Sequence, residues 1–246
     1  MKAFFAALQF LTLFPWPRRA ARSADEIGAG ALFFPLVGLV LGAVLVLADY
    51  LLRPYFPPAL LAVALVALLA LLSRAFHLDG LADTFDGLGA GGARERMLKI
   101  MDDPHIGVFG VAAVVLVLLF KIEAIEPMIA GTADCWRALL IAPMLGRWAM
   151  VLAAYRSAAA KEGLGSSLIG RMSGAQLFFA TVITFVLAAG FARGTGLWVM
   201  AWVALFTLAC KSYFHRRLGG LTGDAFGAVE ELSESSALIL FALAQR

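Results

Sequence analysis

Long, continuously apolar segments restrict what this sequence can fold into. Several of them reach the ~20 residues that an α-helix needs to cross a bilayer. Hydrophobic residues make up 62% of the chain and charged residues only 15%, whereas soluble domains contain about 25% charged residues. A soluble globule of this composition would expose too much apolar surface. Because the segments do not alternate in polarity, a β-barrel is excluded, and the sequence predicts an all-α, polytopic integral membrane protein.

Six membrane-spanning helices are predicted, at about residues 31–53, 58–76, 108–130, 135–155, 177–193 and 196–213. A seventh apolar helix is expected at roughly 224–245, although its first half is acidic. The first 17 residues are expected to form a short interfacial or re-entrant helix. Residues 93–101 predict a cytoplasmic amphipathic helix that rests on the membrane surface. We expect one transmembrane helical domain over residues 1–246.

The basic residues gather on one side of these spans. They precede the first span and fill the connections that follow the second, fourth and sixth spans: Arg18, Arg19, Arg22, Arg94, Arg96, Lys99, Arg156, Lys161, Arg171, Lys211, Arg216 and Arg217. The opposite connections hold only Arg53 and Arg193. The positive-inside rule makes the crowded side cytoplasmic, so the polar connections are expected to face the cytoplasm. No basic stripe with interleaved aromatic residues accompanies the net charge of +3, so no nucleic-acid partner is expected.

An acidic segment from His77 to Gly87 follows the second span. Its aspartates, Asp79, Asp83 and Asp86, are spaced i, i+4, i+7 and therefore share one stripe of a helix. Three stacked carboxylates repel one another, so a cation is expected among them. Oxygen ligands of this type suit Mg²⁺, with Mn²⁺ as the alternative. A solvated helix end capped by aspartate would not explain the single stripe.

A second acidic segment begins the C-terminal helix. Thr222 or Asp224 is expected to cap this helix. Asp224 and Glu231 lie nearly in line at i and i+7, Glu234 sits at the edge of their face, and Glu230 points elsewhere. An acidic first turn that complements the helix dipole would explain Asp224 but not Glu231, two turns later. We expect both acidic segments to converge on the cytoplasmic side.

Two cations lie inside predicted spans, where charge is costly and needs a partner. Lys121 and Arg147 either bind a substrate phosphate or neutralise Glu123, Glu126 or the aspartates. The two interpretations are balanced for Lys121, and the planar guanidinium favours phosphate for Arg147. His77 is expected to hydrogen-bond a carboxylate rather than to transfer a proton.

Clustered aspartate, glycine and interior arginine suit a divalent ion that holds a diphosphate while a hydroxyl group attacks it. A carboxylate would take the proton of the nucleophile. A transporter would instead carry its charges near mid-bilayer, on broken helices within internal repeats, and no such repeat is visible. The residues alone therefore indicate a metal-dependent transferase with a phosphorylated or nucleotide-activated substrate.

The chain resembles the cobalamin synthase family, the adenosylcobinamide-GDP ribazoletransferases, over nearly its whole length. The matching segments include residues 10–12, 15–18, 34–38, 77–87, 96–101 with Asp103, 106–107, Lys121, Arg147, 162–165 and 219–234. The resemblance implies that α-ribazole, or its 5′-phosphate, attacks the cobinamide phosphate of adenosylcobinamide-GDP in a Mg²⁺-dependent reaction. GMP leaves, and adenosylcobalamin or its phosphate is formed.

The family's acidic motif carries over to specific positions of this chain. Asp79, Asp83 and Asp86 are expected to be metal ligands, with Asp224 and Glu231 as ligands of a second set. Either Asp83 or Asp86 also serves as the base, and the sequence does not decide between them. The expected substrate-binding residues are His77, Lys121, Arg147, Thr222 and Glu234.

Two other functions stay open at this stage. A CDP-alcohol phosphotransferase runs the same chemistry with CMP as leaving group, but the spacing of its motif differs and its Ala-Arg pair is missing here. The non-enzyme alternative is a membrane transporter of a charged metabolite. Membrane lipid is an expected partner, and the sequence leaves open whether the chain forms a homo-oligomer.

Overall fold

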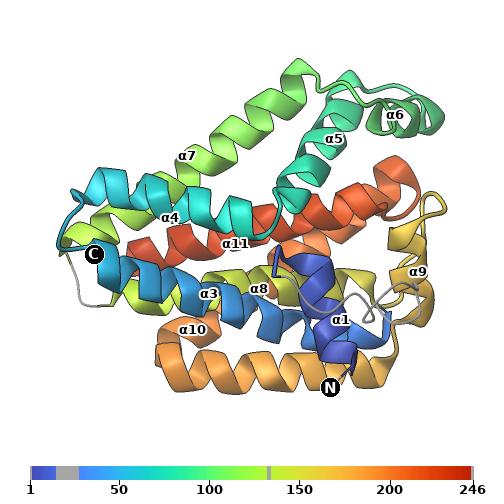
Figure 1. Cartoon of the computed structure of the whole chain (residues 1–246). Coiled ribbons are helices and arrows are strands. Elements are labelled where there is room, and N and C mark those ends of the chain that lie inside the picture. Colours follow the sequence, from blue (N-terminus) through green and yellow to red (C-terminus); the bar gives the residue numbers. More distant parts are fainter. Residues whose placement is uncertain (1, 15–27, 132–133, 245–246) are drawn as a thin grey trace.

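The computed structural model describes residues 2–14, 28–131 and 134–244, and this part of the chain is helical without a β-strand (Figure 1). This confirms the all-α prediction. The helices are α1 (Lys2–Leu11), η1 (Ala31–Phe33), α3 (Phe34–Leu52), α4 (Pro58–Leu72), α5 (Phe76–Ala90), α6 (Arg94–Met101), α7 (Val108–Gly131), α8 (Cys135–Ala154), α9 (Leu164–Arg171), α10 (Gly174–Leu218) and α11 (Gly223–Ala244).

Helix α8 forms the centre of the bundle. It packs against α3, α10 and α11. Of its apolar 18-residue stretch, 89% is buried inside the protein. Helices α7 and α10 instead expose most of their apolar residues, because the corresponding 18-residue stretches are only 33% and 22% buried. Large apolar side chains that stay exposed on long helices are what a lipid-facing surface requires. The bundle therefore has a protein-covered axis and a lipid-facing periphery.

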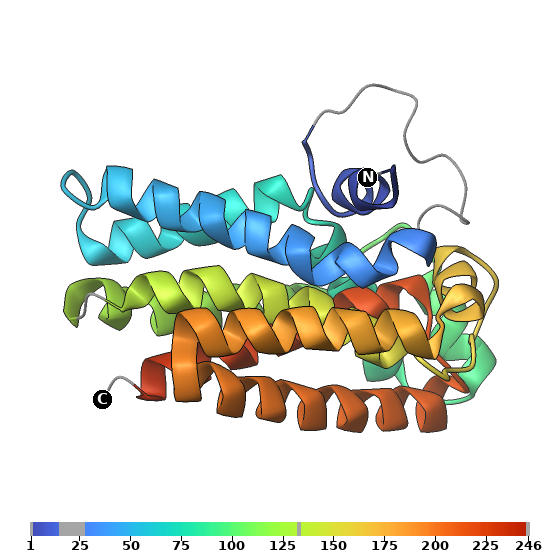
Figure 2. The same cartoon turned by 90° about the horizontal axis from the view of Figure 1, so that it is seen from below.

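Four single helices are long and apolar enough to span a membrane, and α4 with α5 would make a fifth if the bent pair is one span. Helix α10 covers both predicted spans 177–193 and 196–213. Its backbone is non-helical at Arg193 (φ 52°, ψ −138°), where two arms meet and fold back side by side (Figure 2). The prediction of two spans in this region thus corresponds to two arms of α10. The total number of crossings stays a prediction.

The segment that links α4 to α5 differs from the prediction. The apolar helix ends at Leu72 rather than near residue 76, and the acidic helix then runs at an angle of 89° to it. Arg74 and Ala75 adopt positive φ values of 59° and 52°, and the Ser73 hydroxyl donates a 2.9 Å hydrogen bond back to the Leu69 carbonyl. The acidic residues therefore sit on a separate helix that crosses the bundle.

The described basic residues of the predicted cytoplasmic connections lie at the end of the bundle that holds α6, α9 and the start of α11 (Figure 1). The linkers that carry Arg53 and Arg193 lie at the other end. The predicted asymmetry of charge is thus present in the fold, although Arg18, Arg19 and Arg22 lie outside the described residues. Helix α1 precedes the bundle with Ala6, Ala7 and Leu11 buried. Helix α6 is amphipathic as predicted, with Met97 and Met101 buried.

Candidate active site

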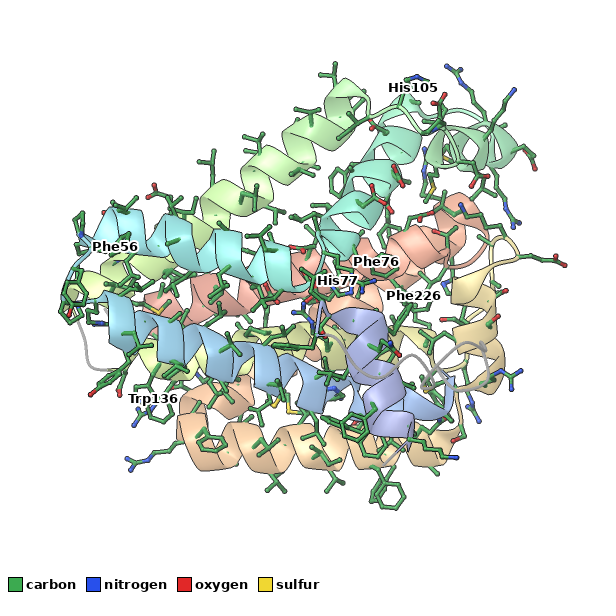
Figure 3. All side chains as sticks on the ribbon, in the orientation of Figure 1. Phe56, Phe76, His77, His105, Trp136 and Phe226 are labelled. Atoms are coloured by element: carbon green, nitrogen blue, oxygen red, sulfur yellow. The ribbon has the colours of Figure 1, made fainter. Side chains whose placement is uncertain are left out.

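Helices α5 and α11 cross at glycines, and this crossing brings the two acidic segments together. A Cβ atom on Gly80 would lie 2.8 Å from the backbone oxygen of Asp224, and one on Gly227 would lie 2.9 Å from the carbonyl oxygen of His77. Because neither residue has a side chain, the backbones approach each other directly. Figure 3 shows Phe76, His77 and Phe226 gathered at this crossing. Residues separated by more than a hundred positions thus share one site.

A pocket of about 200 Å³ opens beside the crossing, and we call it the acidic pocket. It is formed by the start of α5, the segment before α9 and the start of α11. Its lining residues are Phe76, Asp79, Gly80, Lys161, Glu162, Gly163, Gly165, Gly223 and Asp224. Acidic side chains and glycines thus dominate its wall. Such a wall gives a phosphate group access to the backbone and offers carboxylate oxygens to a cation.

Lys161 connects the acidic pocket to the end of α6. Its Nζ atom lies 2.5 Å from a carboxylate oxygen of Asp102 and 3.1 Å from Oδ2 of Asp224. Partial burial acts to lower the pKa of Lys161, but the hydrogen bond to Asp102 and the charge of Asp224 outweigh it and raise the pKa above 10.5. The ammonium group is therefore a permanent positive charge at the pocket wall.

Asp83 lies one turn after Asp79 on α5 and is half-buried. It lies within electrostatic reach of Asp79, Asp224 and Lys161. Oδ2 of Asp224 is buried and has no hydrogen-bond partner among the described residues, with Lys161 alone as an ionic neighbour. Carboxylates grouped in this way repel one another and supply the hard oxygen donors that Mg²⁺ prefers. The donor set of Asp79, Asp83 and Asp224 therefore fits a divalent cation.

Asp86 joins α5 to the start of α7. Its two carboxylate oxygens accept hydrogen bonds from the backbone N–H groups of Gly107 and Gly110, at 2.7 and 2.8 Å. These N–H groups belong to the start of α7, where the helix provides no internal acceptors. Asp86 is thus a capping residue that joins α5 to α7. The expectations that it acts as a metal ligand or as the base stay predictions.

A set of ionic side chains is buried where α5, α7, α8 and α11 meet, and we call it the buried ionic cluster. Its members are His77, Lys121, Arg147, Glu230, Glu231 and Glu234. Every one of them is less than 5% exposed. Each carboxylate in the cluster has a cationic or imidazole partner, which is the condition under which buried charge is tolerated.

The pairing within the buried ionic cluster is reciprocal. Lys121 Nζ contacts Glu231 at 2.6 Å and Glu234 at 2.5 Å. Arg147 contacts Glu230 at 2.5 Å and also bonds Glu234. His77 Nδ1 lies 3.1 Å from Glu230.

This arrangement gives several of the predicted site residues partners within the protein. Lys121 and Arg147 pair with glutamates of α11, not with Glu123, Glu126 or the aspartates that the neutralising interpretation named. Neither residue lines the acidic pocket. Glu231 is paired with Lys121 instead of joining Asp224 as a ligand. Glu234 and His77 are equally enclosed by protein. In each case the reason is the same, because a buried charge takes the nearest opposite charge.

His77, Glu230 and Glu231 also present ligand atoms within 4.8 Å of one another, the spacing of a metal site. Lys121 and Arg147 already supply the positive charge at these carboxylates. His77 was predicted to hydrogen-bond a carboxylate, with an aspartate as the expected partner. Its Nδ1 atom instead lies 3.1 Å from Glu230, and neither ring nitrogen makes a hydrogen bond among the described residues. The sequence analysis did not include Glu230 among the site residues. The feature that could have identified it is Arg147, because a cation inside a span needs a counterion.

Thr222 begins α11. Its Oγ1 atom accepts a 3.0 Å hydrogen bond from the backbone N–H of Ala225, which confirms the capping interpretation. The side chain is buried and does not line the acidic pocket, and its substrate-binding role stays a prediction. By contrast, His105 projects from the surface beside Asp103, at the far end of α5 in Figure 3.

Four residues of the acidic pocket come from a segment that contains none of the predicted site residues. Lys161, Glu162 and Gly163 lie between α8 and α9, and Gly165 lies in the first turn of α9. Together they close one wall of the pocket. Spacing arguments cannot find them, because no periodic pattern relates this segment to α5 or α11. The matching segment 162–165 in the family resemblance was the available signal.

Comparisons with known proteins agree with one another. The cobalamin-5-phosphate synthase family model matches residues 3–242. An adenosylcobinamide-GDP ribazoletransferase of Geotalea daltonii is 44% identical, with 95% of this chain and 94% of the relative covered. Proteins of the same name from Syntrophobacter fumaroxidans and Escherichia coli are 42% and 39% identical. The alignment with the Syntrophobacter fumaroxidans protein covers 94% of both chains. The alignment with the Escherichia coli protein covers 95% of this chain and 96% of the relative.

No solved structure matches this chain significantly. The family match and the relatives each extend over nearly the whole sequence, including both acidic segments. The chain therefore belongs to the cobalamin-5-phosphate synthase family and is a transferase of cobalamin biosynthesis.

Proposed function

We propose that the acidic pocket is the reaction centre of a Mg²⁺-dependent transfer from adenosylcobinamide-GDP to α-ribazole or its 5′-phosphate. A hydroxyl group of the ribazole attacks the phosphate attached to cobinamide. The new P–O bond forms as the P–O bond to GMP breaks, and GMP leaves with the electron pair of that bond. The products are GMP and adenosylcobalamin, or its phosphate.

The observation that carries this proposal is the glycine crossing of α5 and α11. It places Asp79 and Asp224, from two distant segments, on the wall of one pocket. Asp79, Asp83 and Asp224 would hold the Mg²⁺ ion, and Mn²⁺ would suit the same oxygen donors. A bound ion would neutralise charge on the diphosphate and on the departing GMP.

The remaining roles follow from position. Asp83 is half-buried, within electrostatic reach of the pocket residues Asp79 and Asp224, and is the candidate base for the proton of the ribazole hydroxyl, since Asp86 already accepts two backbone hydrogen bonds. Lys161 adds a fixed positive charge at the pocket wall, where it can pair with a phosphate oxygen. Gly163, Gly165 and Gly223 keep that wall free of side chains.

We also infer the orientation of the chain in the bacterial inner membrane. The acidic pocket lies at the end of the bundle that carries most of the basic residues, and the positive-inside rule makes this end cytoplasmic. Water-soluble substrates made in the cytoplasm would then reach the pocket directly. The proposed sidedness predicts that cysteines introduced near Lys161 react with a membrane-impermeant maleimide only in inside-out vesicles.

The test uses the purified full-length protein in liposomes with adenosylcobinamide-GDP, α-ribazole and Mg²⁺, and follows GMP release. We expect Asp83→Asn and Asp224→Asn each to lower turnover at least about a hundredfold, as loss of a base or of an electrostatic group commonly does. Asp134→Asn is the matched control, because Asp134 is a carboxylate paired with Arg137 at the opposite end of the bundle.

The same assay separates the alternatives. Release of CMP from a CDP-alcohol without GMP formation would support the CDP-alcohol phosphotransferase, and solute flux without bond formation would support a transporter. Wild-type activity in both aspartate variants would refute the acidic pocket as reaction centre. The names of the relatives favour the ribazoletransferase over both alternatives.

A further inference from the structure

A second cavity lies on the opposite side of α5 from the acidic pocket, and we call it the apolar cavity. It has a volume of about 480 Å³ and lies between α5, α7, the second arm of α10 and α11. Its wall includes Phe85, Phe109, Cys210, Phe214 and Leu232. None of its lining residues among those described carries a charge. The volume falls within the about 300–1,000 Å³ typical of ligand sites, yet the proposed reaction makes no use of it.

The apolar cavity is continuous with the lipid-facing surface. Two of its lining residues, Phe109 and Tyr213, are 57% and 45% exposed. Leu205 and Leu208, one to two turns earlier on the same arm of α10, are exposed as well. Because this arm is part of a membrane-spanning helix, the cavity opens toward hydrocarbon. An occupant would therefore enter from the bilayer.

Two exposed arginines lie one helical turn beyond the apolar cavity. Arg216 follows Tyr213 by three residues, and Arg217 follows Phe214 by three, so each shares a helix face with a lining residue. Arg217 also contacts the sulfur of Met97 on α6 at 3.8 Å. Both arginines belong to the basic end of the bundle, where headgroups of the adjacent leaflet lie. An apolar slot thus leads to a pair of cationic groups.

We propose that the apolar cavity binds one acyl chain of an anionic phospholipid, whose phosphate lies against Arg216 and Arg217. An acyl chain matches the uncharged wall, and a negative headgroup matches the cationic pair at its end. Neither half of this arrangement suits the polar substrates, which the acidic pocket receives on the other side of α5. The enzyme thereby has a lipid site separate from its reaction centre.

The test is lipid binding to the purified full-length protein, measured by native mass spectrometry during titration with palmitoyl-oleoyl phosphatidylglycerol or phosphatidylcholine. We expect a saturable site that prefers phosphatidylglycerol. The variant Arg216→Gln/Arg217→Gln should lose roughly thirtyfold in affinity for phosphatidylglycerol, since each basic residue near an anionic surface contributes about fivefold. Arg156→Gln, an exposed arginine of the same end that lies away from the cavity, should bind as wild type.

A second pair of variants tests the cavity itself. Ala209→Trp places an indole in the apolar cavity and should abolish the saturable site. Val182→Phe enlarges an exposed apolar residue on the first arm of α10 and should leave it intact. Equal affinity for both lipids, or undiminished binding by Ala209→Trp, would overturn the proposal. Because the readout is binding and not turnover, these results stand apart from the test of the proposed reaction.

Discussion

Replacement of Arg147 by methionine distinguishes a structural cation from a substrate ligand. Arg147 is 1% exposed and contacts Glu230 and Glu234. After the change, Glu234 keeps its 2.5 Å contact with Lys121, whereas Glu230 keeps only the imidazole of His77. Removal of one partner from a buried ion pair costs about 3–5 kcal/mol. We expect a loss of this size in the free energy of unfolding.

The assay is equilibrium unfolding in mixed detergent micelles, followed by circular dichroism. The double variant Arg147→Met/Glu230→Gln removes the unpaired charge and should recover about half of the lost stability. Arg137→Met on the same helix is the control, because the Arg137 pair with Asp134 is partly exposed and should change stability by less than about 1 kcal/mol. A loss below about 1 kcal/mol in Arg147→Met, with turnover strongly reduced, would refute the structural role and restore the substrate-binding interpretation.

Three further predictions concern the crossing, the cap and the pocket cation. Gly80→Val should abolish GMP release, because its Cβ atom would lie 2.8 Å from the backbone oxygen of Asp224, whereas Gly170→Val, with nothing within 4 Å of a Cβ, should retain activity. Asp86→Ala should lower stability by about 1–2 kcal/mol in the same unfolding assay, as loss of a helix cap does. Lys161→Met should lower kcat/KM equally between about pH 6 and pH 9, because a raised pKa keeps the ammonium group charged until the pH exceeds 10.5. A loss confined to alkaline pH would contradict this assignment.

The length of the continuous apolar segments predicted the helical class, because such segments have few alternatives in a membrane. It also located the two arms of α10, which a short non-helical step at Arg193 separates. It did not predict the turn after Leu72, where the left-handed conformations of Arg74 and Ala75 redirect the chain. Neither residue favours that conformation, so the local sequence contains no signal for the turn.

The acidic residues were found from the sequence, but the partners of several of them were not. Helical spacing placed Asp79, Asp83 and Asp86 on one stripe, and tertiary contacts then divided the stripe between a pocket and a helix cap. In α11, Asp224 faces the pocket whereas Glu231, two turns later, meets Lys121 from α7. Spacing within one helix cannot show which neighbouring helix each residue will meet.

The central claim is that carboxylates of α5 and α11 together hold one divalent ion. Mn²⁺ binding to the purified protein, followed by electron paramagnetic resonance of the free ion, tests it without turnover. We predict one saturable site in the wild-type protein, lost in Asp79→Asn and in Asp224→Asn and retained in Asp134→Asn. Retention of the site in both pocket variants would contradict the claim.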